Sequence, residues 1–174
     1  MSETAADQTT RPEPQLLGIY LNDHLAGATA CVQLVRRLAR SLRGTPVEDP
    51  LADLAEDVAA DRKELLAIMD ELGVPVRRYK LYTAAAAELA GRLKFNGHLL
   101  TRSPLSVVVE LEMLRLGIEG TASGWRTLRT VGAAQGRPDV GRVDRLLERA
   151  AEQVALVETL RVRAAARVFV GGSA

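Results

Sequence analysis

Two ionisable side chains occupy positions at which the sequence otherwise places apolar residues. His24 lies three residues after Leu21 and four before Ala28, and Asp61 lies three residues after Val58. Spacings of three and four residues bring side chains to one face of a helix, so both groups belong to faces that should be buried. A buried polar group needs a partner. His24 and Asp61 are therefore the first candidates for a functional site.

Imidazole and carboxylate groups can together bind a metal ion or transfer a proton. One hypothesis is a mononuclear iron or manganese site, or a proton-transfer site, formed by His24, Asp61, Asp23 and a glutamate such as Glu110 or Glu119. The alternative is that a backbone carbonyl satisfies His24, an arginine pairs with Asp61, and no cofactor is bound. A metal site needs three or four converging ligands, and only His24 and Asp61 have inward positions.

Signatures of other catalytic chemistry are absent from the sequence. It contains no Gly-x-Ser-x-Gly, Walker A, His-Glu-x-x-His or Cys-x-x-Cys motif and no dinucleotide-binding fingerprint. Ser106, Ser123 and Cys31 have no base that the sequence identifies. These absences favour a protein that is not an enzyme; the alternative is a metal-binding protein or a metal-dependent oxidoreductase with its site near His24 and Asp61.

Small residues interrupt two stretches of good helix formers. Gly27 lies in the first, and Gly117, Gly120 and Gly124 lie in a later one. Each glycine within a helix costs about 1 kcal/mol relative to alanine. If the two helices cross antiparallel, Gly27 meets Gly120 and Ala30 meets Gly117, which predicts a close approach of the two backbones. The alternative is a ligand cavity lined by Tyr20, Gly27, Gly120, Gly124 and Trp125.

Positive charge is concentrated in one segment, residues 75–102. Six cations stand there against the single acid Glu88, a net charge of +5, which leaves −4 for the rest of a chain of net charge +1. Such a segment could meet an acidic partner, although its side chains could also pair with the acidic second helix. Nucleic acid is not expected, because no helix-turn-helix or RNP pattern accompanies the charge. The candidate binding residues are Arg77, Arg78, Lys80, Arg92, Lys94 and Arg102.

The elements that must position these residues are helices. Apolar residues recur at spacings of three and four in four long blocks, and no block alternates as a half-buried strand would. We expect long helices over residues 14–43, 50–72, 104–131 and 140–170, and a short helix over 79–93. The short links at residues 44–49 and 132–139 predict two antiparallel hairpins. The segment between the hairpins is long enough to cross the bundle from end to end.

Charge placement predicts how the helices of each hairpin face one another. Counting outward from the first turn gives three pairs: Arg36 with Asp57, Arg40 with Asp53, and Arg43 with Asp49. The same count in the second hairpin places Glu110 level with Arg161, and we expect an ion pair between them.

Composition places the chain among globular proteins with one domain. Apolar residues make up 47% and charged residues 26% of 174 residues. Residues 1–13 read as a polar disordered tail, and residues 14–170 as a single helical domain. A lone cysteine, Cys31, the lack of a signal peptide and the lack of a long apolar stretch predict a cytoplasmic protein that does not enter a membrane. The abundance of alanine, and of arginine over lysine, suggests a GC-rich bacterial genome.

Two antiparallel hairpins joined by a long crossover resemble the ferritin-like superfamily, and the likeness covers residues 14–170. The resemblance implies an all-α four-helix bundle whose crossover here carries an extra short helix. In that family, carboxylates and two Glu-x-x-His motifs hold a dinuclear iron or manganese site. This sequence has no Glu-x-x-His, and its only histidines are His24 and His98. We therefore expect a bundle without that metal site, acting as a homodimer or as a module that binds a protein partner.

Overall fold

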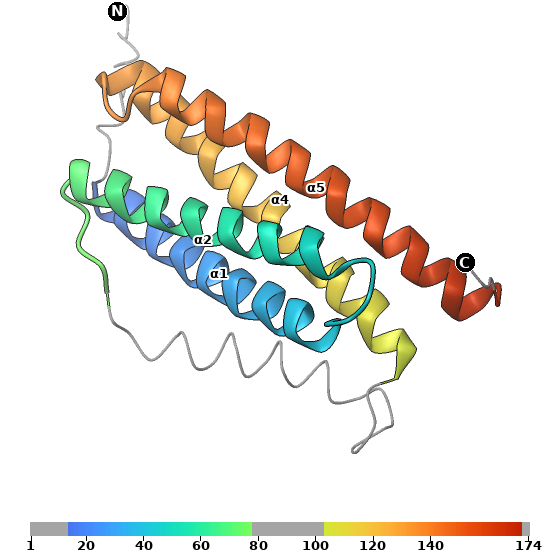
Figure 1. Cartoon of the computed structure of the whole chain (residues 1–174). Helices are drawn as coiled ribbons and strands as arrows, with labels where there is room; N and C mark the ends of the chain where they lie inside the picture. The colour runs from blue at the N-terminus through green and yellow to red at the C-terminus, as the bar shows by residue number, and fades with distance from the viewer. Residues whose placement is uncertain (1–13, 78–102, 172–174) are drawn as a thin grey trace, which may run out of the picture.

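Four long helices make up the part of the chain that the computed structural model describes, residues 14–77 and 103–171 (Figure 1). They are α1 (Pro14–Ser41), α2 (Glu48–Glu71), α4 (Pro104–Gln135) and α5 (Val140–Phe169). No strand occurs in these two ranges. The all-α prediction is confirmed, and each predicted long helix is present to within a few residues at its ends. The predicted tail at residues 1–13 and the predicted short helix at 79–93 lie outside the described residues.

Local sequence explains where the helices begin and end. Ser103 caps α4 by accepting a hydrogen bond from the Leu105 N–H at 3.3 Å, and Pro104 follows at the first helical position. Asp139 caps α5 in the same way, through the Arg142 N–H at 2.7 Å. Gly136 follows α4 with a φ of 73°, a backbone conformation that favours glycine at helix ends.

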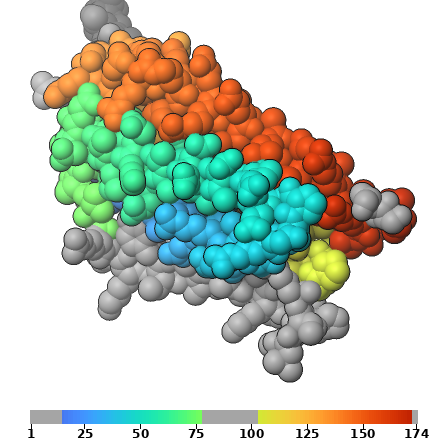
Figure 2. All heavy atoms as spheres, viewed as in Figure 1, coloured from blue at the N-terminus to red at the C-terminus, as the bar shows by residue number. Residues whose placement is uncertain are grey.

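Neighbouring helices run antiparallel on all four sides of the bundle. Within the hairpins, Arg62 of α2 donates to Thr29 of α1, and Arg129 of α4 pairs with Asp144 of α5. Between the hairpins, α1 lies against α4. On the other side, α2 lies beside α5 (Figures 1 and 2).

The chain leaves α2 and enters α4 at opposite ends of the bundle. Pro75, just after α2, accepts a hydrogen bond at 3.1 Å from Asn22, in the first half of α1. Glu110, near the start of α4, instead pairs with Arg37, near the end of α1. Residues 77 and 103 therefore lie at opposite ends of the bundle, which agrees with the separation that the predicted crossover requires.

One apolar core joins the four helices. Its fully buried side chains include Leu25 of α1, Met69 of α2, Leu114 of α4 and Val157 of α5. Trp125 is also buried, with 1% of its surface exposed. Within the described ranges, no helix is long and apolar enough to cross a membrane.

The predicted ion pair between Glu110 and Arg161 is wrong. Glu110 is buried and pairs with Arg37 of α1 at 3.2 Å, whereas Arg161 contacts Glu112 at 3.5 Å and Glu158. The α4–α5 register places position 112, not 110, opposite 161. Two residues rotate a side chain by about 200° around a helix, so Glu110 is directed to the other neighbour of α4.

The three ion pairs predicted within the first hairpin are also not formed. The hydrogen bond from Arg62 to Thr29, at 2.8 Å, sets a register that differs from the predicted one by two residues. The side chains of Arg36, Arg40 and Arg43 are exposed to solvent. Exposed charges gain little from pairing, so they do not determine how the two helices pack.

Candidate functional site

His24 lies on α1 where that helix meets α4, and its side chain is half-buried. Its ring packs against the ring of Tyr20, with centroids 4.3 Å apart and an interplanar angle of 58°. The Tyr20 hydroxyl shares a hydrogen bond of 2.9 Å with Thr127 of α4, which fixes the aromatic ring across the two helices. Burial lowers the pKa of His24, and the negative charge of Asp23 partly opposes this effect. Burial therefore favours the uncharged form of the imidazole.

An open groove of about 380 Å³ runs beside His24 between α1 and α4. We call it the α1–α4 groove; its lining residues are Tyr20, Asp23, His24, Gly27, Ala28, Gly117, Gly120 and Thr121. A methyl group added at Gly27 or at Gly120 would meet no atom of the described residues within 4 Å. Within this part of the chain, the missing side chains leave open space at both positions. The close backbone approach predicted for Gly27 and Gly120 is therefore wrong.

Close packing does occur one helical turn to either side of Gly120. A Cβ added at Gly117 would overlap the Sγ atom of Cys31, and one added at Gly124 would lie 3.0 Å from Nδ1 of His24. Gly117 thus meets Cys31 and not Ala30, a difference of one residue from the predicted register. The two hypotheses for these glycines each describe part of the interface, because α1 and α4 touch at Gly117 and Gly124 and leave a groove between them.

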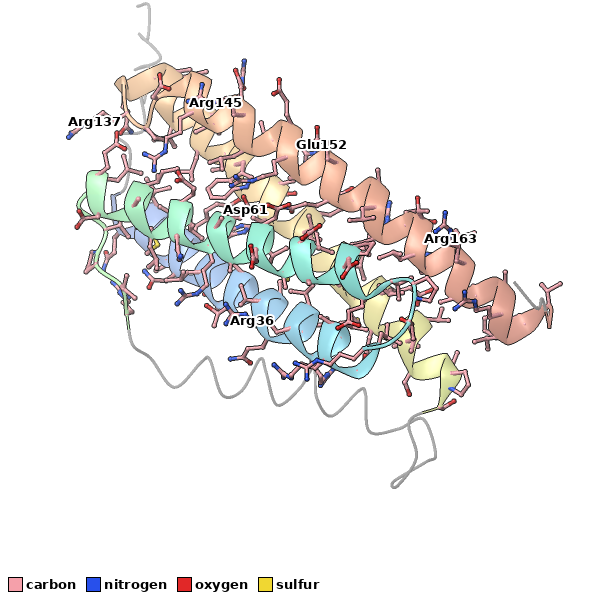
Figure 3. All side chains as sticks on the ribbon, in the orientation of Figure 1. Arg36, Asp61, Arg137, Arg145, Glu152 and Arg163 are labelled. Atoms are coloured by element: carbon pink, nitrogen blue, oxygen red, sulfur yellow. The ribbon has the colours of Figure 1, made fainter. Side chains whose placement is uncertain are left out.

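Asp61 lies in a different part of the bundle, between α2 and α5 (Figure 3). Its buried carboxylate accepts hydrogen bonds from the guanidinium of Arg149, from Nε at 2.9 Å and also from Nη2, and from Nε2 of Gln153 at 2.7 Å. The prediction that an arginine pairs with Asp61 is confirmed, and Arg149 is that arginine. Burial raises the pKa of Asp61, while the hydrogen bonds from Gln153 and Arg149 act in the opposite direction.

The two inward-facing candidates for a metal site are thus held in different interfaces. His24 faces α4 and the α1–α4 groove, and Asp61 faces α5. Across residues 14–77 and 103–171, no three histidine, cysteine or acidic side chains are grouped so that they could hold a metal ion. Asp23 is exposed beside His24 and brings only a second potential ligand there. Glu110 is engaged with Arg37 at the far end of α1.

The remaining candidates are distributed as follows. Tyr20, Gly27 and Gly120 come together in the α1–α4 groove, as the cavity hypothesis required, whereas Trp125 is a core residue. Arg77 is exposed, and its backbone N–H donates to Asn22 at 2.8 Å. The other five basic candidates lie outside the described residues: Arg78, Lys80, Arg92, Lys94 and Arg102.

Sequence reasoning missed the two partners of Asp61. Gln153 lies three residues after Ala150 and four before Val157, both of which face inward, so its spacing marked it as a buried polar residue. Arg149 lies at the edge of that face, so its spacing did not predict a buried residue. Its long side chain reaches the interior from this position.

A comparison of this chain with protein-family models, with curated proteins and with solved structures found no match.

Proposed function

We propose that this chain is a non-catalytic, ferritin-like helical bundle that acts as a homodimer through the α1–α4 groove. The observation that carries the proposal is the pair Gly27 and Gly120, which contact no other described residue through a Cβ position, at the cost in helix stability that glycine brings. Packing among residues 14–77 and 103–171 does not require glycine at either position. Glycine would be required there by a surface that must admit a side chain from another molecule.

The chemistry beside the groove favours binding over catalysis. The buried polar groups Asp61 and Gln153 are bonded to each other, and Glu110 is paired with Arg37. His24 is close to the open groove, but among the described lining residues Asp23 alone brings a carboxylate beside it. A single imidazole beside one carboxylate provides neither a metal ligand set nor an activated nucleophile.

A second copy of the chain is the partner that the surface fits best. Leu16 and Ile19 are exposed apolar residues on the same side of α1 as the groove, with 60% and 44% of their surfaces exposed. In a two-fold arrangement, two α1 helices cross antiparallel. A residue that precedes the axis by a given number of positions then faces the partner's residue that follows the axis by the same number. An axis near residue 21 places Leu16 of one copy opposite Gly27 of its partner. The groove then accepts the leucine side chain.

Sedimentation velocity of the full chain tests this arrangement. We expect a dimer that Gly27→Leu and Leu16→Glu each dissociate, the first by filling the groove and the second by placing a charge in it. Ala151→Leu, which adds the same side chain at an exposed position of α5, should leave the dimer intact. A wild-type chain that is monomeric at every concentration would contradict the homodimer. An acidic protein partner, bound through the basic residues 77–102, would then be the remaining form of a binding function.

The competing function is metal binding near His24 and Asp61, with iron or manganese. Elemental analysis of the purified full chain separates the two functions. Stoichiometric iron, manganese or zinc that is lost in His24→Ala would overturn the binding-module proposal. Metal content at background level in both proteins is the result that we expect.

A further inference from the structure

A second, more enclosed pocket lies at the end of the bundle where α1 and α5 finish and α2 and α4 begin. It has a volume of about 120 Å³, and all four helices or their turns line it. Buried leucines form its floor: Leu51 of α2, Leu111 of α4 and Leu160 of α5. We call it the end pocket. It shares no lining residue with the α1–α4 groove, so binding in the end pocket does not depend on the proposed homodimer.

The walls of the end pocket are apolar and its rim is cationic. Leu42, Val47 and Val107 are only partly buried, so they leave apolar surface open to a ligand. Arg163 and Arg167 complete the lining from α5. They are four residues apart, so they lie on the same side of the helix one turn from each other. Figure 3 shows Arg163 on the C-terminal half of α5.

The two rim arginines have no ion-pair or hydrogen-bond partner among the described residues. Three other arginines of α5 are engaged: Arg142 with Glu64, Arg149 with Asp61 and Arg161 with Glu158. Arg145, exposed near the start of α5, also has no partner among the described residues, but it does not line the end pocket. Three carboxylates adjoin lining residues in sequence: those of Glu48, Glu110 and Glu112. Glu48 accepts a hydrogen bond from the Gly44 N–H, Glu110 pairs with Arg37 and Glu112 contacts Arg161, and none of the three pairs with a rim arginine. Like charges at this spacing repel each other, so an anion between them would be stabilised.

The C-terminal dipole of α5 explains only part of this arrangement. A cation in the last turn of a helix is favoured by the dipole, and Arg167 occupies that turn. Arg163 lies one turn earlier, where the dipole is weaker. An unpaired second arginine at the mouth of an apolar pocket is not explained by helix stability.

We propose that the end pocket binds a small organic carboxylate with an apolar body. The carboxylate would lie between Arg163 and Arg167, whose planar guanidinium groups donate paired hydrogen bonds to such groups. The apolar body would rest on the leucine floor. A dry, apolar cavity of about 150 Å³ holds a benzene molecule, so this pocket suits a single ring or a short alkyl chain.

The test measures binding of hexanoate to the full-length chain by calorimetry and by amide chemical shifts. We expect saturable binding, with shifts at residues of the end pocket. The double variant Arg163→Gln, Arg167→Gln should weaken binding by about tenfold or more, because two charge-assisted hydrogen bonds are lost. Arg145→Gln removes an unpaired arginine from the opposite end of α5 and should leave the affinity unchanged (Figure 3).

Two further arms test the apolar half of the site. Ala164→Leu should abolish binding by filling the pocket that Ala164 lines, while Ala166→Leu, at an exposed position, should not. Thermal unfolding of each variant shows that the loss is not a loss of fold. Acetate, which has the charge without the chain, and hexanol, which has the chain without the charge, should each bind far more weakly than hexanoate.

The proposal is overturned if hexanol binds as well as hexanoate, because the arginines would then have no role. It is equally overturned if acetate matches hexanoate, or if hexanoate causes no saturable shift. A peptide with a C-terminal leucine that binds much more tightly than hexanoate would assign the pocket to a protein partner and would also overturn it.

Discussion

At the residue scale, the glycines of α4 have different structural consequences although the sequence presents them alike. An added Cβ at Gly117 would overlap the Cys31 sulfur atom, whereas one at Gly120 would meet only open space. The thiol of Cys31 is itself buried, which raises its pKa to about 11 and keeps it protonated at neutral pH. Cys31 is thus a packing residue beside Gly117, and not a nucleophile.

Substitution of these glycines by alanine should give opposite results. Gly120→Ala should raise the free energy of unfolding by up to about 1 kcal/mol, because alanine is the better helix former and fits without contact. Gly117→Ala should lower it by about 1–3 kcal/mol through overpacking against Cys31. Denaturant unfolding measures both effects.

A double-mutant cycle tests the cause. In the Cys31→Ala background, Gly117→Ala should lose most of its penalty, because the sulfur atom is gone. If Gly117→Ala and Gly120→Ala have the same effect in the wild-type chain, α1 and α4 do not approach as described.

His24 should make stability dependent on pH. Its pKa in the folded chain lies below the ordinary value of 6.5, so the unfolded chain binds a proton more readily. The contribution of His24 to stability is therefore complete above pH 6.5 and decreases as the pH falls from 6.5 towards the folded-state pKa.

Urea unfolding across this pH range, on the wild type and on His24→Gln, measures the effect. The variant should lack the part of the pH dependence that His24 provides. His98→Gln, which removes the other histidine, should retain that part. An unchanged pH dependence in His24→Gln would contradict the effect of burial on this imidazole.

At the scale of elements, α2 and α5 meet through polar side chains. Arg149 and Gln153 reach from α5 to Asp61, and Arg142 reaches to Glu64 at 2.7 Å. By contrast, α4 approaches α1 so closely that a Cβ added at Gly117 would overlap the side chain of Cys31. The two hairpins therefore join by direct packing between α1 and α4 and by long polar side chains between α2 and α5.

The polar cluster around Asp61 should be easier to replace than to break. Asp61→Ala leaves Gln153 and Arg149 without their acceptor, and removal of one partner of a buried pair costs about 3–5 kcal/mol. Arg149 is one-third exposed, so the lower end of this range is expected. The combined variant Asp61→Leu, Arg149→Met, Gln153→Leu should be markedly more stable than Asp61→Ala, because no polar group remains unpaired.

Chemical denaturation of the wild type and both variants measures the difference. Glu64→Ala is the matched control, because it removes a carboxylate that also contacts α5 but is partly exposed. It should cost less than about 1 kcal/mol. A combined variant that is less stable than Asp61→Ala would show that the charged cluster itself specifies the α2–α5 contact.

At the scale of the whole molecule, one core includes side chains from both hairpins, so the hairpins should unfold together. Loss of α1 and α2 would expose Leu114 and Trp125 of α4, which are buried in the common core. The fluorescence of Trp125 and the helical circular dichroism signal should therefore change at the same denaturant concentration.

Two separate transitions would contradict this expectation. In that case the α4–α5 hairpin would retain its structure after α1 and α2 unfold. A single transition in the wild type that separates into two in Asp61→Ala would assign part of the coupling to the α2–α5 contact.

The sequence by itself determined the helices and their arrangement in hairpins. Apolar spacing, Ser103, Asp139 and the glycines after each helix act over a few residues, so their effect can be read locally. The sequence also identified Asp61 as a buried polar group, because Asp61 interrupts an apolar series.

Only the tertiary structure decided which faces meet. The predicted register of α4 against α5 was wrong by two residues. Because side-chain direction changes by about 100° per residue in a helix, Glu110 faces Arg37 of α1 and not Arg161 of α5. Whether a glycine marks a contact or a groove depends on the distance between two helices that are far apart in sequence. For the same reason, neither Arg149 as the partner of Asp61 nor the end pocket between four helix ends could be derived from local spacing.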